Sequence, residues 1–375
     1  MFKRVLITGG AGFIGSHLAD LLVETGYKVR VYDNLEPQVH GSSGKPPDYL
    51  NPGAEFVRGD ILDTDALRKA LTDVDAIIHC GALVGVGQSQ YEIRRYTNVN
   101  TLGTSNLLDI MTNERKSVQR LVIIGSMSIY GEGLYRRPSD GKRVTPSLRP
   151  LSQLEKHDFE VHDPETGEAL EPIPTPESKG TQCNSIYALG KKDQEDYAFL
   201  IGRERGVSVV ATRFFNVYGP RQALSNPYTG AAAIFSSRLK NGHAPLIYED
   251  GKQLRDFTYV RDVAEAVHFV MESPKAQLEA YNVCTGKPTS ILELAGLLAK
   301  LYGVPQLKPE IVRKFRSGDI RHCYGDSSKL ASLGWKSKIT VEDGLSRLVK
   351  WSAEQVAVDQ FDKAHRELES RGLVK

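Results

Sequence analysis

The feature that most constrains the fold is a glycine-rich turn near the start of the chain. Residues 3–8 are apolar and β-branched, and glycines follow at positions 9, 12 and 15. Apolar spacing over residues 14–25 predicts a helix that ends before Gly26. Glycines let the backbone approach a pyrophosphate closely, and a helix N-terminus offers unpaired N–H groups and a positive dipole end. The turn therefore predicts a strand, a phosphate-binding loop and a helix, with Gly9, Gly12, Phe13, Ile14 and Gly15 as cofactor-binding residues.

A second apolar run extends this unit and ends in a carboxylate. Residues 28–32 read as a strand, and Asp33 follows them, 18 positions after Gly15. A carboxylate at this place accepts hydrogen bonds from both ribose hydroxyls of a dinucleotide and repels a 2′-phosphate. A glycine triplet alone also serves ordinary tight turns. Together with Asp33 it predicts a site for NAD rather than NADP.

Strand and helix patterns alternate along most of the chain. Such alternation predicts an α/β fold with a doubly wound parallel sheet covered by helices on both faces. After Gly219 the elements become shorter, which predicts a first domain at 1–219, with an insertion at 132–186, and a smaller lobe at 220–375 with segments that return to the first domain. The other expected strands are 55–58, 76–79, 121–125 and 208–212, and the other expected helices are 64–71, 98–111, 186–200, 231–240, 263–272, 290–301 and a solvated terminal helix at 353–371.

Composition narrows the partners. The chain has 48 Lys and Arg against 46 Asp and Glu, a formal net charge of +2, so we expect no nucleic acid and a small-molecule partner. No window approaches the ~18 uncharged apolar residues of a membrane span, and no signal-peptide pattern follows Arg4, so we expect no membrane partner and a cytoplasmic location. The cysteines at 80, 183, 284 and 323 match no metal-ligand spacing, and we expect no metal.

A second motif carries acid–base chemistry. Tyr187 and Lys191 are four residues apart in a helix-forming segment, so both side chains project from one face. An ammonium beside a phenol favours the phenolate and lowers the pKa of the tyrosine, which makes it a usable general acid and base. Ser126 ends the predicted strand before this helix, at the edge of the sheet where ligands bind in such folds. A surface pair of Tyr and Lys is the alternative.

These motifs occur in the order typical of one family. Thr8–Gly15, Asp60, His79–Ala82, Asn98–Asn100, the Ser126 strand, Tyr187–Lys191, Arg213–Arg221, Arg255–Val260 and Arg316 resemble the extended short-chain dehydrogenase/reductases, and most closely their nucleotide-sugar epimerases. The resemblance implies a Rossmann-type fold and a homodimer of the family kind through the helix of Tyr187. It assigns catalysis to Ser126, Tyr187 and Lys191. It adds Asn34, Asp60, Ile61, Ala82, Asn98 and Phe214 to the cofactor site, and Val84, Ser128, Asn216, Arg255 and Arg316 to the substrate site.

Three further runs narrow the resemblance to the dTDP-L-rhamnose 4-epimerases. They are residues 33–41, 84–89 and 222–230. The implied reaction interconverts dTDP-L-rhamnose and dTDP-6-deoxy-L-talose at C4, and UDP-glucose or a related UDP-hexose is the alternative substrate. Dehydratases and decarboxylases of the same fold place acidic residues directly after the serine, where this chain has Met127 and Ser128. A regulator that binds NAD without catalysis is a further alternative, although such a protein is expected to lose the Tyr–Lys pair.

The insertion at 132–186 contains 55 residues and many prolines. In many of these relatives the corresponding segment carries paired cysteine ligands, whereas Arg137, Asp163 and Thr166 align with those positions here and Cys183 is the only cysteine nearby. Because long segments in compact domains are usually functional or disordered, and this one ends beside Tyr187, we expect a metal-free flap at the substrate entrance.

Overall fold

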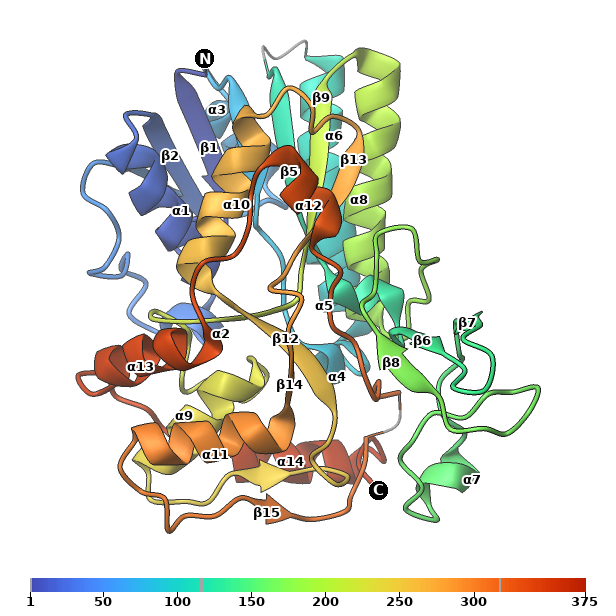
Figure 1. Cartoon of the computed structure of the whole chain (residues 1–375). Coiled ribbons are helices and arrows are strands. Elements are labelled where there is room, and N and C mark those ends of the chain that lie inside the picture. Colours follow the sequence, from blue (N-terminus) through green and yellow to red (C-terminus); the bar gives the residue numbers. More distant parts are fainter. Residues whose placement is uncertain (1, 115–117, 317) are drawn as a thin grey trace.

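The computed structural model describes residues 2–114, 118–316 and 318–375, and its centre is a parallel sheet (Figure 1). Seven strands of the described chain hydrogen-bond in the order β13-β9-β5-β4-β1-β2-β3, and each neighbouring pair is parallel. The order reverses between β1 and β4, so a crevice opens there at the carboxyl ends of the strands. The strands are β1 (Arg4–Thr8), β2 (Lys28–Asp33), β3 (Glu55–Arg58), β4 (Ala76–His79), β5 (Arg120–Ser126), β9 (Ser208–Phe214) and β13 (Glu279–Val283).

Helices cover both faces of this sheet because alternate residues of each strand point to opposite sides. Val5 and Ile7 of β1 pack against α1 and α10, while Leu6 packs on the opposite side with α3, α6 and α8. The sheet is therefore the doubly wound Rossmann-type arrangement that the sequence predicted. The helices are α1 (Phe13–Glu24), α3 (Thr64–Ala70), α6 (Gly103–Asn113), α8 (Ile186–Arg205) and α10 (Val260–Glu272), and a π-helical turn, η1 (Thr97–Leu102), leads into α6.

A second lobe packs below the carboxyl edge of the sheet. Its core lies between α9, α11, α13 and a three-stranded sheet in the order β10-β12-β14. Its elements are β10 (Asn216–Tyr218), α9 (Ala231–Lys240), β11 (Leu246–Ile247), β12 (Leu254–Tyr259), β14 (Pro288–Ser290), α11 (Ile291–Leu301), β15 (Glu310–Ile311), α13 (Val341–Ser352) and α14 (Phe361–Ser370). In contrast, α12 (Ser328–Leu333) packs on the large sheet beside β13, and its Leu330 belongs to the core that contains α1 and α10. No described helix is long and apolar enough to cross a bilayer.

Within the described residues, the chain returns from this lobe to the large sheet with α10 and β13, and again with α12. β13 pairs with β9 in parallel, from Glu279 opposite Val210 to Val283 opposite Phe214. The sequence analysis assigned no strand to these five residues. A buried asparagine, Asn282, obscures their apolar pattern, and its side chain is satisfied by Tyr130 Oη at 2.7 Å and the Thr175 carbonyl at 2.9 Å.

The terminal segment differs from the expected solvated helix at 353–371. α13 ends at Ser352, and α14 begins only at Phe361. Ala364 and Leu368 of α14 are buried, so this helix has a packed face. Charge density alone did not reveal that face, because two apolar positions a turn apart are enough to dock a short helix.

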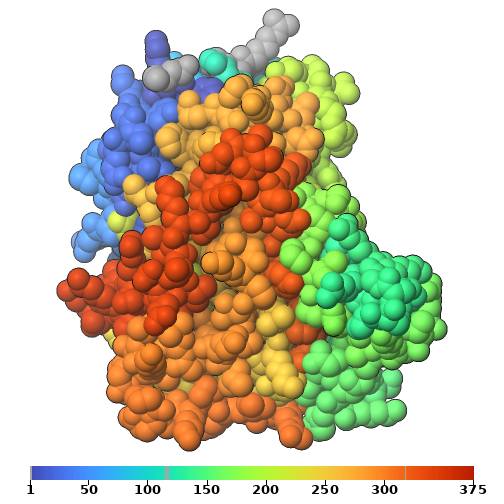
Figure 2. All heavy atoms as spheres, in the orientation of Figure 1, coloured from blue at the N-terminus to red at the C-terminus, as the bar shows by residue number. Residues whose placement is uncertain are grey.

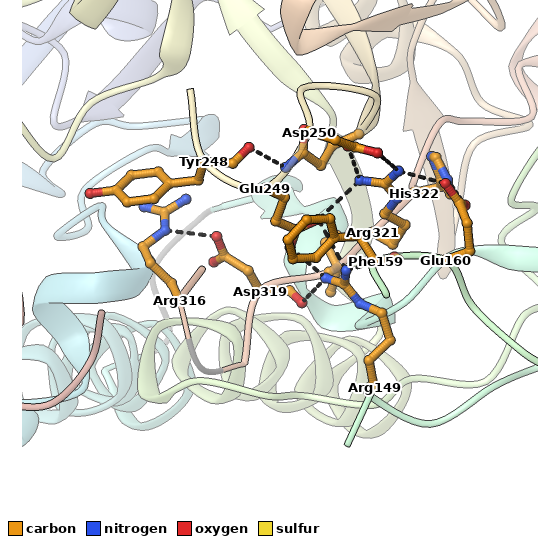
Figure 3. Close-up of polar contacts among 12 residues, drawn as sticks. Arg149, Phe159, Glu160, Tyr248, Glu249, Asp250, Arg316, Asp319, Arg321 and His322 are labelled. Carbon is orange, nitrogen blue, oxygen red and sulfur yellow. Dashed lines mark hydrogen bonds and ion pairs between the residues drawn. The ribbon is translucent and has the colours of Figure 1, made fainter. Parts of the chain in front are cut away.

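The insertion folds against the second lobe. It forms β6 (Leu134–Arg136), β7 (Arg143–Val144), α7 (Leu151–Leu154) and β8 (Glu171–Ile173), with the strands in the order β7-β6-β8. Figure 2 shows it as a green projection beside the yellow and orange second lobe. Arg149 pairs with Glu249 at 2.8 Å, and Arg321 donates to Glu160 at 2.6 Å (Figure 3). The insertion is thus held by ion pairs between segments far apart in the sequence.

The insertion, residues 132–186, is described in full and lies outside the lining of the large cleft reported below, and its expected position at the substrate entrance stays a prediction. At the aligned cysteine positions, Arg137 Nε donates to Asp163 Oδ2 at 2.9 Å, and Asp163 Oδ1 accepts from the Thr166 N–H at 3.1 Å. An ion pair therefore links the two turns. Within the described ranges, no group of three or more His, Cys, Asp or Glu is arranged to hold a metal ion.

Candidate active site

The loop between β1 and α1 forms a glycine cradle. Gly9 has φ +64°, and a Cβ there would lie 2.9 Å from Gly81 N. A Cβ on Gly15 would clash with the Gly9 carbonyl oxygen. No side chain caps α1 at Gly12, so the first N–H groups of this twelve-residue helix face the cleft without a side-chain partner. The cradle fits the pyrophosphate of a dinucleotide, because it offers close backbone approach and a helix N-terminus.

Asp33 ends β2 beside this loop. Its Oδ2 accepts from the Ala11 N–H at 3.0 Å and its Oδ1 from the Leu35 N–H at 2.8 Å, which fixes the carboxylate and leaves each oxygen a lone pair for a ribose hydroxyl. His40 Nε2 lies 3.8 Å from Oδ1, and burial lowers the pKa of this histidine. Asn34 donates to Asp60 Oδ2 at 2.8 Å at the same end of the cleft. The arrangement suits an adenosine without a 2′-phosphate.

One cleft of about 390 Å³ joins these groups to the edge of the second lobe. Most of the residues that the sequence predicted line it. They are Gly9, Gly12, Phe13, Ile14, Gly15, Asp33, Asn34, Asp60, Ile61, Ala82, Val84, Ser126, Tyr187, Lys191, Phe214 and Asn216. Lys191 is the sole Lys or Arg among the described residues of its lining.

Ser126, Tyr187 and Lys191 meet at the base of this cleft. Ser126 ends β5, and α8 carries the other two side chains a turn apart. The side chain of Ser185 caps α8 by accepting from the Ala188 N–H at 3.0 Å. The Ser126 hydroxyl lies near enough to the Tyr187 hydroxyl to lower the pKa of that phenol. This geometry brings a phenol and an alcohol to one point, where both can engage a single substrate oxygen.

Burial sets the acidity of both titratable groups. It lowers the pKa of Lys191 to about 8. It raises the pKa of Tyr187, and the Ser126 hydroxyl opposes this only in part. The expected lowering of the tyrosine pKa by Lys191 is therefore wrong for this structure, because removal of the phenol from water disfavours its anion more strongly than its neighbours favour it.

Four predicted residues lie outside the cleft. Asn98 lies in η1, whose next residue, Val99, lines the cleft instead. The Ser128 N–H donates to Ser126 Oγ at 3.2 Å. The guanidinium of Arg255 donates to the carbonyl oxygens of Leu254, Ile320 and Arg321, each at 2.8 Å. Arg316 donates to Asp319 at 2.7 Å and lies over the Tyr248 ring (Figure 3). Both arginines are thus engaged by protein groups rather than directed into the cleft.

A cluster of amides crosses the cleft wall, and the sequence analysis did not name its members as site residues. Gln38 Nε2 donates to Gln88 Oε1 at 3.0 Å and to Asn226 Oδ1 at 3.3 Å. Gln88 Nε2 returns a bond to Gln38 Oε1 at 3.1 Å. These residues come from α2 (Pro37–His40), α4 (Val86–Ser89) and the 222–230 loop. The sequence contained a signal for them, because each lies in one of the three runs that resemble dTDP-L-rhamnose 4-epimerases.

Two buried acceptors in the cleft wall have no protein partner. Asn216 Oδ1 and Gln222 Oε1 are both buried without a hydrogen bond, and both residues line the cleft. Gln222 Nε2 donates to Thr229 Oγ1 at 3.2 Å, which turns its amide oxygen away from Thr229. A buried acceptor without a partner costs free energy, so this wall suits a ligand with hydroxyl donors.

Comparison with known proteins identifies the family. The model of the NAD dependent epimerase/dehydratase family matches residues 5–155 and 164–284. A dTDP-L-rhamnose 4-epimerase from Burkholderia thailandensis is 35% identical over 94% of this chain and 96% of its own length. A UDP-glucose 4-epimerase from Thermotoga maritima, solved with UDP-glucose, has a TM-score of 0.75 and 30% identity over 94% of this chain and 99% of that chain. The UDP-glucose 4-epimerase from Thermus thermophilus, solved with NAD, has a TM-score of 0.72 and 28% identity over 94% and 100% of the two chains.

The chain belongs to the NAD dependent epimerase/dehydratase family. It is an enzyme of this family, and NAD is its cofactor.

Proposed function

We propose that this enzyme is a nucleotide-sugar 4-epimerase that interconverts dTDP-L-rhamnose and dTDP-6-deoxy-L-talose. The observation that carries the proposal is the amide cluster of Gln38, Gln88 and Asn226. It joins, on one cleft wall, the three sequence runs that resemble dTDP-L-rhamnose 4-epimerases. The relative from Burkholderia thailandensis, similar along nearly its whole length, supports the same substrate.

In this proposal Tyr187 acts as a phenolate, a form that the positive charge of bound NAD would favour over the raised pKa of the empty cleft. As a phenolate it takes the proton from the sugar 4-hydroxyl and later returns it. Ser126 hydrogen-bonds the same oxygen, as its contact with the Tyr187 hydroxyl allows. Lys191 has one N–H donor left for a ligand in the cleft, because its other two donate to the Ile124 carbonyl oxygen and to Gln194 Oε1, each at 2.9 Å. The glycine cradle and Asp33 hold NAD, which when bound supplies a hydride acceptor and donor. The 4-keto sugar rotates in the cleft and is then reduced on its other face. The reaction is redox-neutral, because the hydride removed from C4 returns to C4.

Met127 argues against water loss or decarboxylation at this site. Its side chain follows Ser126 and packs with Tyr130 and Phe215 in an apolar cluster. A thioether neither donates nor accepts the proton that these reactions require. The intact contact between Ser126 and Tyr187 argues against a regulator without catalysis.

The test is turnover with defined substrates. We expect dTDP-L-rhamnose to be converted to a mixture of C4 epimers, with a higher kcat/KM than UDP-glucose. Tyr187→Phe is expected to lower kcat by about 10² to 10⁴-fold, the range for a positioned acid–base group. Tyr27→Phe, at a tyrosine outside both α8 and the cleft lining, is the control and is expected to keep full activity. Unchanged turnover in Tyr187→Phe would refute the assignment.

UDP-hexose epimerisation is the second candidate, supported by the Thermotoga maritima neighbour solved with UDP-glucose. A hexose presents a 6-hydroxyl that needs a partner, whereas a 6-deoxy sugar favours an apolar wall. Val84 lines the cleft and is 58% exposed, and Ala82 and Leu83 precede it in the lining. A clear preference for UDP-glucose in the same assay would change the substrate and leave the chemistry at C4 intact.

We also propose a cytoplasmic homodimer that packs through α8. Leu189, Tyr197 and Leu200 of this helix are 48%, 37% and 54% exposed, and such apolar exposure favours an interface. Light scattering after gel filtration is expected to give twice the chain mass. Leu200→Glu is expected to yield monomers, and a monomeric wild-type protein would exclude this interface.

A further inference from the structure

A buried chain of hydrogen bonds begins at Lys191, behind the cleft. Lys191 is 3% exposed, and its Nζ donates to Gln194 Oε1 at 2.9 Å. Gln194 is 1% exposed and does not line the cleft. Its Nε2 donates to Thr104 Oγ1 at 2.8 Å, which connects α8 to α6. The ammonium of Lys191 is therefore held from behind by a neutral amide.

The series of hydrogen bonds continues from Thr104 to the glycine cradle. His79 Nε2 is 2.9 Å from Thr104 Oγ1, and His79 Nδ1 is 2.7 Å from Thr8 Oγ1. Thr8 Oγ1 also accepts from the Gly81 N–H at 3.1 Å, and Gly81 contacts Gly9. His79, Thr8 and Thr104 are each fully buried. One continuous path thus joins Lys191 to the first glycine of the cofactor loop.

One assignment of donors and acceptors satisfies the 2.9 Å and 2.7 Å contacts of His79, while Gln194 Nε2 lies 3.3 Å from His79 Nε2 and would donate to it in the other tautomer. Thr104 Oγ1 gives its only proton to the Asn100 carbonyl at 2.7 Å, so His79 Nε2–H donates to Thr104. His79 Nδ1 then accepts from the Thr8 hydroxyl. Burial lowers the pKa of His79 to about 3, so the ring stays neutral near physiological pH. Each hydroxyl of the path both donates and accepts, and such fully satisfied buried networks are rigid.

We propose that Gln194 is a positioning residue: through His79, Thr104 and Thr8 it fixes the Lys191 ammonium relative to the glycine cradle and directs its third donor into the cleft. The proposal rests on the role of Lys191 in the proposed function. A flexible four-carbon side chain needs such fixation to present one donor in one direction.

The neutral charge of Gln194 matters for the titration of Lys191. Three titratable groups lie around the ammonium: His79 and Cys80, at and just after the end of β4, interact with it electrostatically, and Tyr187 is one turn away on its own helix. Burial raises the pKa of Cys80 to about 12 and that of Tyr187 above its usual value, while His79 is neutral. Of these groups, Lys191 alone changes charge near pH 8. A carboxylate at position 194 would stabilise its charged form, and loss of the acceptor would destabilise it.

The test compares Gln194→Glu and Gln194→Met with Gln253→Met, a buried glutamine of the second lobe outside the cleft lining. Two readouts are followed from pH 6 to 10: the alkaline limb of kcat, and the NAD retained by the purified enzyme after gel filtration. The limb is expected near pH 8 in the wild type. We expect Gln194→Glu to move both midpoints up, and Gln194→Met to move them down, by about one pH unit. Gln253→Met is expected to leave both unchanged.

If the pH midpoints of Gln194→Glu and Gln194→Met shift in opposite directions, Gln194 acts on Lys191. A mere loss of protein stability would move neither midpoint. Circular dichroism verifies folding, and the isosteric Gln194→Glu keeps the test open if the methionine variant does not fold. Unmoved midpoints in Gln194→Glu, or an equal shift in Gln253→Met, would overturn the proposal. If no nucleotide sugar turns over, the proposed function fails, while NAD retention still decides the role of Gln194.

Discussion

Arg321 is expected to be among the most costly polar residues to replace. Its side chain is fully buried, between the insertion and the second lobe (Figure 3). Nη1 donates to Glu249 at 3.0 Å and to Asp250 at 2.6 Å, while Nη2 donates to Glu160 at 2.6 Å and to Asp250 at 2.9 Å. Arg321→Met keeps most of the volume and removes all four bonds and the charge.

The magnitude follows from what the substitution leaves behind. Removing one member of a buried ion pair typically destabilises a protein by about 3–5 kcal/mol, because the partner stays buried without its counter-charge. The side chains of Glu160 and Asp250 are 43% and 30% exposed, so water replaces part of their lost bonds. Glu249 is 3% exposed and keeps only Arg149. We therefore expect a loss near the lower end, about 3 kcal/mol.

Urea denaturation measures this loss, followed by both circular dichroism and tryptophan fluorescence so that coincident transitions justify a single free energy of unfolding. Arg136→Met is the matched control within the same insertion. Arg136 pairs with Glu171 at 2.8 Å, and both side chains are at least half exposed. This pair is expected to contribute less than about 1 kcal/mol. Equal losses in the two variants would refute the argument that burial decides the contribution of these ion pairs.

Two other substitutions test separate parts of the structure. Gly15→Ala is expected to weaken NAD binding at least about tenfold, because its Cβ would clash with the Gly9 carbonyl oxygen; undiminished affinity in a calorimetric NAD titration would contradict the cradle. A Cβ on Gly296 meets no atom within 4 Å, so Gly296→Ala is expected to stabilise α11 by about 0.4–1 kcal/mol, as measured by thermal unfolding. The hydrogen bond from His322 and, after it, the one from Arg321 lower the pKa of Glu160 to about 2 in the folded protein. The Glu160 carboxylate therefore contributes fully to the free energy of unfolding above its unfolded-state pKa of about 4.3, and this contribution is lost as pH falls toward 2. The stability difference between wild type and Glu160→Gln is therefore expected to shrink from pH 5 to pH 2, and a constant difference would contradict this origin.

Local patterns in the sequence predicted the central fold well. β3 (Glu55–Arg58) and β4 (Ala76–His79) have the predicted boundaries, and the glycine turn and Asp33 lie together as expected. These elements are encoded by neighbouring residues: an apolar run, a turn and a carboxylate at its end. β13 was not predicted, because its identity depends on partners for Asn282 that lie over one hundred residues away.

The surroundings of single charged residues could not be read from the sequence. Arg255 is held by carbonyl oxygens of Leu254, Ile320 and Arg321, and two of these lie more than 60 positions away. The insertion docks through Arg149 and Glu249, which are 100 positions apart. Such contacts leave no periodic trace, because one ion pair needs only one residue in each segment. The roles assigned to Arg255 and Arg316 stay predictions.

Because β13 comes late in the sequence, the large sheet cannot be completed until late in the synthesis of the chain. β9 ends at Phe214, and the strand that covers its edge is complete only at Val283, 69 residues later. At about 5–20 residues per second, the ribosome needs roughly 3–14 s to supply it. During that interval the apolar β9 presents unpaired backbone groups, a template for pairing with another nascent chain. Elongation speed between residues 214 and 283 is therefore expected to govern the yield of soluble enzyme.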